Sequence, residues 1–290
     1  MGERSNIFVR IRAKENTKGK KYTYGTFFGL YYPWCYGERM ISRLRSAIDF
    51  AEKHLDGWHG RAAVDPERTE KFKRYLAINF DMRDIVEPTD LIPYTVENLK
   101  QGFATPGADI FAQEENHGYI YVDISLDDPD RTYGDYKAKV KYAFVDYEAG
   151  PGRKNPPVRS VENFADHDMG EDKRKWFEPD PYWDEEQNSS WGPEHKEDFL
   201  SDTVPACREN IDEINKNASV MSEEERKDFV RFGRRFTRNI LKKAAQEKET
   251  CRAKRENFLD ALLPGKELSP YARDALIELV EKSFPKPLRG

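Results

Sequence analysis

The sequence predicts an α+β fold, in which N-terminal antiparallel β-hairpins with packed helices precede a mainly α-helical C-terminal region. Apolar side chains alternate along two pairs of segments within the first 150 residues, as they do on half-buried strands. After residue 200, apolar residues recur at three- and four-residue spacing behind helix N-caps. The expected parts are an α+β domain over 1–150, an acidic aromatic linker or arm over 151–200, and a helical region over 201–290.

The first hairpin is expected over residues 6–33. A basic turn that contains a glycine, KENTKGKK at 14–21, separates an alternating strand from an aromatic one. The residues of the first strand that share one face are Ile7, Val9 and Ile11. An amphipathic helix should follow from Gly37 to Leu55, and Gly57 is placed to end it.

Two further helices and a second hairpin complete the N-terminal part. Asp65 as N-cap and Pro66 at the first helical position predict a helix to about residue 80. Thr95 is expected to cap a short helix. Alternation then predicts strands at 117–125 and 136–148, joined by a link rich in turn formers.

The last ninety residues carry three helix signatures. The first covers Pro205 to about Asn217. In the second, Ser222 and Glu225 have the spacing of a capping box, and the helix they open should reach Leu263. In the third, Ser269 caps a helix with proline at its first turn.

Composition excludes several classes of protein. The 290 residues have a net charge of −5, with 35% charged and 13% aromatic residues. The charge is uneven, because residues 101–200 hold 11 basic and 23 acidic side chains whereas residues 1–60 hold 11 and 6. Three scattered cysteines, no signal-peptide core and no long apolar run predict a cytoplasmic protein that does not enter a membrane. Phosphate-loop, dinucleotide and serine-hydrolase patterns are missing, so no cofactor is predicted. Neither His nor Cys recurs at short ligand spacing, and the acidic segment ADHDMGED at 165–172 is typical of a solvated loop, so no metal site is predicted.

Cys35 is the one candidate nucleophile. It lies between two aromatic residues where the helix from Gly37 begins, and a helix N-terminus lowers the pKa of a thiol. A cysteine in such a setting is more often a small packed side chain. We therefore predict no catalytic residue and keep thiol chemistry at Cys35 as an alternative.

A possible nucleic-acid face follows if both hairpins share one sheet. Cations for phosphates and rings for base stacking would then lie on the same face. Solvated cross-strand pairing on an exposed face is the simpler interpretation. The residues concerned are Arg10, Arg12, Tyr119, Tyr121, Lys137, Lys139 and Lys141.

Two charged segments predict contact with a partner protein. Aromatic residues among carboxylates suit docking into a basic cleft, and this acidic aromatic arm comprises Trp176, Phe177, Tyr182, Trp183, Asp184, Glu185, Glu186 and Trp191. An arginine stripe on the helix after Ser222 could hold an acidic partner or the arm itself, and it comprises Arg231, Arg234, Arg235 and Arg238. The arm could equally fold back on its own chain, and the stripe could be a solvated face. The C-terminal helices could also pair two copies of the chain.

The opening of the chain resembles a group of uncharacterised phage and prophage proteins. These begin with a Gly-x-Arg-Ser-Asn-Ile strand and reach an aromatic LY-x-x-W turn before a helix. The matching residues are Gly2, Arg4, Ser5, Asn6, Ile7, Leu30, Tyr31 and Trp34. The resemblance covers about the first fifty-five residues and departs at Pro33 and Cys35. It implies a phage origin and, as for many such accessory proteins, binding to a host protein or to a host enzyme that acts on nucleic acid.

These observations favour a non-enzymatic, phage-derived protein that binds and inhibits or modulates a host protein complex, for example an anti-phage defence effector. The first alternative is a module that binds single-stranded nucleic acid with the basic and aromatic sheet face. The second alternative is a cysteine-dependent enzyme.

Overall fold

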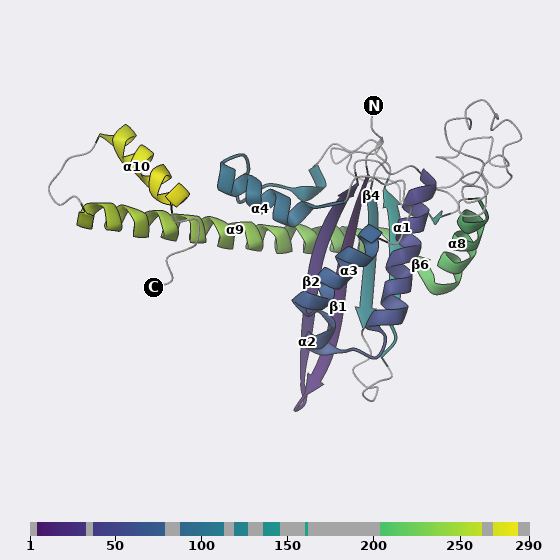
Figure 1. Ribbon diagram of the computed structural model, residues 1–290. Coiled ribbons are helices and arrows are strands. Elements are labelled where there is room, and N and C mark those ends of the chain that lie inside the picture. Colours follow the sequence, from purple (N-terminus) through teal and green to yellow (C-terminus); the bar gives the residue numbers. More distant parts are fainter. Residues whose placement is uncertain are drawn as a thin grey trace, which may run out of the picture. The chain divides into compact units, whose positions relative to one another are not determined.

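The protein has an α+β fold, as its sequence predicts (Figure 1). The computed structural model describes residues 5–32, 37–78, 88–112, 119–126, 136–145, 160–161, 204–262 and 269–283. Within these residues, six strands form one sheet in the order β3-β2-β1-β4-β5-β6.

The first hairpin is confirmed. Strands β1 (Ser5–Thr17) and β2 (Lys20–Tyr32) pair antiparallel over their full length. Lys18 and Gly19 alone connect them, both with positive φ (52° and 73°), which is the two-residue turn that matches the twist of a hairpin.

The second pair of strands is confirmed within the described residues, and it joins the same sheet. β4 (Tyr119–Leu126) pairs antiparallel with β5 (Lys139–Val145) and parallel with β1. The short strands β3 (Thr89–Asp90) and β6 (Ala218–Val220) extend the sheet and were not expected. Strands of two or three residues are too short for alternation to reveal them.

One face of the sheet packs against helices. α1 (Gly37–Phe50) continues into a π-helical turn (Ala51–Leu55), and α2 (Gly60–Ala63) and α3 (Pro66–Ile78) follow. Figure 1 shows α1 and α3 against the same face. α8 (Val204–Asn217) also contributes, because Ile214 is fully buried in this core. The core side chains from the central strands are Ile7, Val9, Ile11, Ile120, Val122 and Ile124.

The opposite face of the sheet is covered by the beginning of α9 (Glu223–Leu262). Phe27 from β2 meets Phe229 with ring centroids 5.6 Å apart, and Tyr121 stacks on Phe229 at 4.9 Å. A short 3₁₀ turn (Ile110–Ala112) adds Phe111, whose ring centroid lies 4.6 Å from that of Phe8. Both faces of the sheet are therefore buried at its centre, and burying each large apolar side chain stabilises the fold by about 1.5–3 kcal/mol.

The helix expected to begin at Thr95 begins earlier. α4 runs from Leu91 to Gln101, and the Ile92 N–H donates to Asp90 Oδ1 at 3.2 Å. Asp90 therefore occupies the capping position, and Pro93 lies in the first turn, where a missing N–H costs nothing. The expectation for Thr95 was wrong because it overlooked this earlier cap.

The chain divides into two compact units built from interleaved segments. The sheet unit comprises Met1–Ile92 and Asp109–Phe236, and the helical unit comprises Pro93–Ala108 and Thr237–Gly290. In the helical unit, Lys248 donates to the carbonyl oxygens of Leu99 and Lys100, both at 3.2 Å. α10 (Pro270–Ser283) belongs to the helical unit, where its Asp274 pairs with Arg252. The boundaries expected at residues 150 and 200 lie outside the described residues.

Candidate functional site

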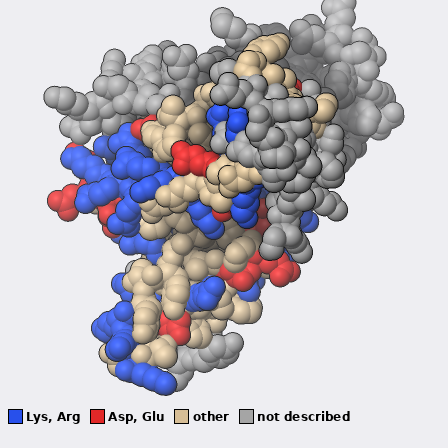
Figure 2. Space-filling model, turned by 90° about the vertical axis from the view of Figure 1, so that its left-hand side faces the viewer, with Lys and Arg blue, Asp and Glu red and all other residues tan. Residues whose placement is uncertain are grey.

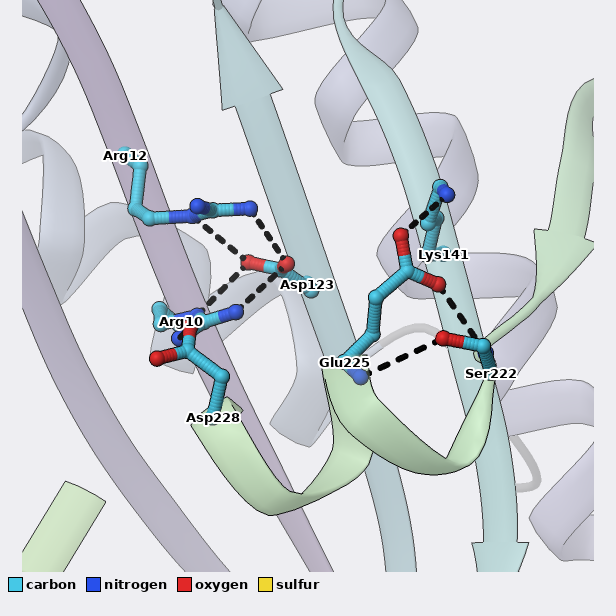
Figure 3. Close-up of polar contacts among 7 residues, drawn as sticks. All are labelled: Arg10, Arg12, Asp123, Lys141, Ser222, Glu225 and Asp228. Carbon is cyan, nitrogen blue, oxygen red and sulfur yellow. Dashed lines mark hydrogen bonds and ion pairs between the residues drawn. The ribbon is translucent and has the colours of Figure 1, made fainter. Parts of the chain in front are cut away.

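A buried cluster of charged side chains lies between the sheet and α9. Alternation along β1 directs Arg10 away from the α1 side and toward α9. The parallel pairing with β4 places Asp123 directly opposite Arg10. Arg10 Nε and Nη2 donate to the two carboxylate oxygens of Asp123, each at 2.8 Å (Figure 3).

Two further charges complete the cluster. Arg12 Nη2 donates to Asp123 Oδ2 at 2.7 Å, and Arg10 Nη1 donates to Asp228 Oδ2 on α9 at 2.8 Å. The group thus holds two guanidinium and two carboxylate groups and is electrically balanced. Arg10 and Asp123 are 1% and 3% exposed, so each charge depends on the others for compensation.

The rings of α9 also contact the buried guanidinium. Arg10 Cζ lies 5.2 Å from the ring centroid of Phe229 and 5.4 Å from that of Phe232, within cation–π range. Burial lowers the pKa of Arg10, but its bonds to Asp123 and Asp228 outweigh burial and leave the pKa above its ordinary value. Arg10 is therefore a permanent cation in the folded protein.

The first turn of α9 is attached to the sheet at a second point. The capping box predicted from the sequence is confirmed, because the Glu225 N–H donates to Ser222 Oγ at 3.3 Å and the Ser222 N–H donates to Glu225 Oε2 at 2.9 Å. Lys141 Nζ on β5 donates to Glu225 Oε1 at 2.5 Å. The bonds from Lys141 and Ser222 hold the pKa of Glu225 below its ordinary value.

This cluster is suited to holding α9 in place rather than to catalysis. Its donors and acceptors are directed at one another, and burial raises the pKa of the neighbouring Tyr121, so that its phenol stays protonated. Among the described residues, no group of three histidine, cysteine or acidic side chains could hold a metal ion.

The helix α9 covers part of the expected nucleic-acid face. Arg10, Tyr119 and Tyr121 are buried, at 1%, 3% and 4% exposure, so they cannot bind phosphates or stack on bases as an open sheet face requires. Lys141 is partly buried and bonded to Glu225. The physical reason is that the apolar side of α9 packs on this face of the sheet, where Phe229 contacts Phe27 and Tyr121.

The rest of the expected face stays accessible. The Arg12 side chain is 32% exposed although it bonds to Asp123. Lys137 and Lys139 are exposed. Figure 2 shows further Lys and Arg side chains gathered at the lower end of the molecule, where the β1–β2 turn lies.

The predicted arginine stripe is exposed in full. Arg231, Arg234, Arg235 and Arg238 all face solvent on successive turns of α9. Arg234 Nε donates to Asp109 Oδ2 at 2.9 Å, and Arg235 Cζ lies 5.7 Å from the Phe232 ring centroid. The first three belong to the sheet unit and Arg238 to the helical unit.

The other predicted site residues lie outside the described residues. They are Cys35 and the acidic aromatic arm, which comprises Trp176, Phe177, Tyr182, Trp183, Asp184, Glu185, Glu186 and Trp191.

The sequence interpretation missed the roles of Asp123 and Asp228. One signal was available for Asp123, because a carboxylate in the middle of an otherwise apolar strand needs a buried cation. β1 offers such a cation at its centre in Arg10. Asp228 carries no comparable signal, since acidic residues are common on the exposed face of a helix.

Comparisons with protein-family models, with curated proteins and with solved structures find no match. In the part of the chain that the structure describes, no helix has the length and apolar character needed to cross a bilayer.

Proposed function

We propose that this chain is a non-enzymatic binding protein that contacts an acidic surface of a partner protein through the arginine stripe of α9. The observation that supports this proposal most is the charge of the exposed side of that helix. Residues 231–243 contain six basic and no acidic side chains. Of the four stripe arginines, only Arg234 forms an ion pair with another described residue.

The chemistry of arginine suits such a contact. A guanidinium group binds carboxylates with two parallel hydrogen bonds, and arginine is enriched among the residues that dominate interface energies. The stripe is also pre-positioned, because Arg10, Asp228 and the capping box fix the first turns of α9 on the sheet. Little backbone ordering then remains for the binding step, and the main ordering cost is the rotamer freedom of the exposed arginine side chains.

The proposed partner is a protein complex of a bacterial host, encountered in the host cytoplasm. This part of the proposal rests on the resemblance of the first fifty-five residues to phage and prophage proteins. An effector of anti-phage defence is one such partner, and inhibition or modulation is the proposed consequence. The acidic aromatic arm is proposed as a second contact, for a basic cleft of the same complex.

The test compares two triple variants of the full-length protein. In the stripe variant, Arg231, Arg235 and Arg238 are changed to Gln, while Arg234 is kept because it pairs with Asp109. In the control variant, three exposed cations near or on α3, namely Lys53, Lys71 and Arg74, are changed to Gln, so that the net charge is matched. Both proteins are used to capture partners from nuclease-treated lysate of the natural host, and the affinity for the purified partner is then measured by calorimetry.

We expect the control variant to bind like the wild type and the stripe variant to bind at least about tenfold more weakly, as for the loss of an interface hot spot. Equal binding by the stripe variant would show that α9 does not carry the contact. A turnover of substrate by the purified protein that Cys35→Ala abolishes would overturn the non-enzymatic part of the proposal.

A further inference from the structure

The β1–β2 hairpin continues beyond the rest of the described sheet. β4 follows β1 as far as the pair Ala13–Leu126, whereas β1 and β2 stay paired to Thr17 and Lys20. Residues 14–23 thus form a two-stranded ribbon, which we call the basic ribbon. All of residues 16–23 are exposed.

The ribbon is strongly cationic. It carries Lys14, Lys18, Lys20 and Lys21, and its one acidic residue is Glu15. Glu15 accepts a hydrogen bond from Thr17 Oγ1 at 2.7 Å, and its side chain lies against Gly60. Four lysines against one carboxylate leave the ribbon with a net charge of +3. The chain as a whole has a net charge of −5, so this local excess of positive charge opposes the overall balance.

The two faces of the ribbon differ. Because Asn16 pairs with Lys21 and Lys14 pairs with Thr23, these residues share the face of Arg12. That face has cations and no aromatic ring. The tyrosines of the ribbon lie on the other face together with Lys20, which pairs with Thr17. There the Tyr22 and Tyr24 rings stack on each other with centroids 6.5 Å apart.

The turn residue Lys18 supports a functional role for the charge. Lys18 is the one non-glycine residue of the described chain with positive φ, at 52°. Turns of this kind prefer Asn-Gly, and a lysine in the left-handed region costs about 1 kcal/mol. A residue that is unfavourable for the turn but adds charge at its tip indicates selection for binding rather than for stability.

We propose that the basic ribbon binds duplex DNA, with Lys18, Lys20 and Lys21 contacting phosphates. A two-stranded ribbon fits the major groove of B-form DNA, which is about 12 Å wide, whereas the major groove of duplex RNA is too narrow. Single strands are disfavoured because the face that carries Lys14 and Lys21 has no ring on which bases could stack, and the two tyrosines of the other face already stack on each other. Arg12 and Lys139 extend the same positive face across the sheet and lengthen the contact.

The test measures binding of the full-length protein to labelled duplexes of about 20 base pairs by fluorescence anisotropy, at salt concentrations from about 20 to 200 mM. The ribbon variant changes Lys18, Lys20 and Lys21 to Gln. The control is the Lys53, Lys71 and Arg74 variant described above, which loses the same charge elsewhere. Loss of three phosphate contacts should lower the slope of log affinity against log salt by about 2.7, and the control should keep the wild-type slope.

Three results would overturn the proposal. They are no binding of the wild-type protein to duplex DNA at the lowest salt, a ribbon variant that binds like the control, and binding of single-stranded DNA or duplex RNA at least as tight as that of duplex DNA. The stripe variant of α9 leaves the ribbon intact, so this proposal and the proposed protein contact fail separately.

A single substitution separates the effect of the Lys18 charge on DNA affinity from its effect on stability. Lys18→Asn puts the preferred residue into the turn, so the melting temperature should stay equal or rise while DNA affinity falls. A variant that keeps full DNA affinity would contradict a role for Lys18, whatever its stability.

Discussion

Arg10 shows how an ion pair can be buried without being a catalytic site. Removing a guanidinium and a carboxylate from water is costly, and only close, multiple hydrogen bonds offset the cost. Arg10 has such bonds to Asp123 and Asp228, and two aromatic rings fill the space around it. The whole group therefore acts as one unit, in which the loss of one member leaves the others uncompensated.

We predict that Arg10→Met lowers the free energy of unfolding by about 3–5 kcal/mol, because Asp123 remains buried with only the partly exposed Arg12 as a partner. The double variant Arg10→Met, Asp123→Leu should recover most of this loss, since both buried charges are then gone. Urea unfolding followed by circular dichroism measures both values. If the losses of the single variants simply add in the double variant, the two residues are not coupled in this way.

At the residue scale, the sequence was sufficient to assign each strand residue to a face of the sheet, but not to show whether that face is exposed to solvent. Alternation correctly placed Arg10, Arg12 and Tyr121 on one face of the sheet. It could not show that the face is covered, because the covering residues lie more than a hundred positions later in the chain. The helical spacing of the apolar residues after Ser222, Phe229 among them, predicts an apolar side of that helix, but periodicity does not identify the surface that such a side contacts.

The packing of α9 on the sheet depends on a glycine. A Cβ atom at Gly233 would lie 2.6 Å from Phe27 Cζ and 2.8 Å from Phe111 Cζ, closer than side chains tolerate. The absence of a side chain lets the helix approach the two rings. Gly233 is buried in the middle of a long helix, where glycine is otherwise unfavourable.

Gly233→Ala therefore tests whether helix propensity or overpacking has the larger effect on stability. Helix propensity favours alanine by about 1 kcal/mol, but overpacking a core costs about 1–3 kcal/mol. We expect a net loss of about 1 kcal/mol in the free energy of unfolding. The matched control is Asn239→Ala on the exposed side of α9, which should raise stability by a few tenths of a kcal/mol. A stabilising Gly233→Ala would show that the helix does not contact the rings closely.

At the element scale, local sequence signals predicted helices and hairpins reliably, but they did not predict which distant strands pair. The β1–β2 hairpin, α1, α3, α8, α9 and α10 follow from alternation, amphipathic spacing and caps. The parallel pairing of β1 with β4 does not, because alternation is the same in parallel and antiparallel strands. The boundary inside α9, between Phe236 and Thr237, is equally invisible to local patterns, since the helix continues across it.

For the whole molecule, the attachment of α9 makes part of the stability depend on pH. The pKa of Glu225 is lowered by Lys141 and Ser222. Burial raises the pKa of Asp228, but the bond and charge of Arg10 outweigh burial and lower it. A lowered carboxylate pKa stabilises the fold above the unfolded pKa of about 4, and this stabilisation is lost as the pH falls through the folded value. Asp90 contributes to the pH dependence of stability with the opposite sign, because burial raises its pKa despite the bond from Lys73.

The difference in unfolding free energy between the wild type and Lys141→Gln isolates the Glu225 contribution, because Asp90 is unchanged in both. The pair is partly exposed, so we expect a difference below about 1 kcal/mol that is constant above about pH 5. It should shrink toward zero as Glu225 is protonated below about pH 4. Urea titrations at a series of pH values measure it, and a difference that grows on acidification would have the wrong sign for this ion pair.

The carboxylate of Asp123 also has a consequence for how the chain avoids misfolding. No tight turn connects β1 to β4, so nothing local prevents the two strands from slipping past each other by two residues, which would keep every apolar side chain on its own face. Such a slip in one direction would put Asp123 beside Phe8, and in the other it would leave Arg10 beside Tyr121. Either arrangement leaves a buried charge beneath α9 without its partner. The Arg10–Asp123 pair therefore selects one register of β1 against β4, although the apolar pattern alone permits several.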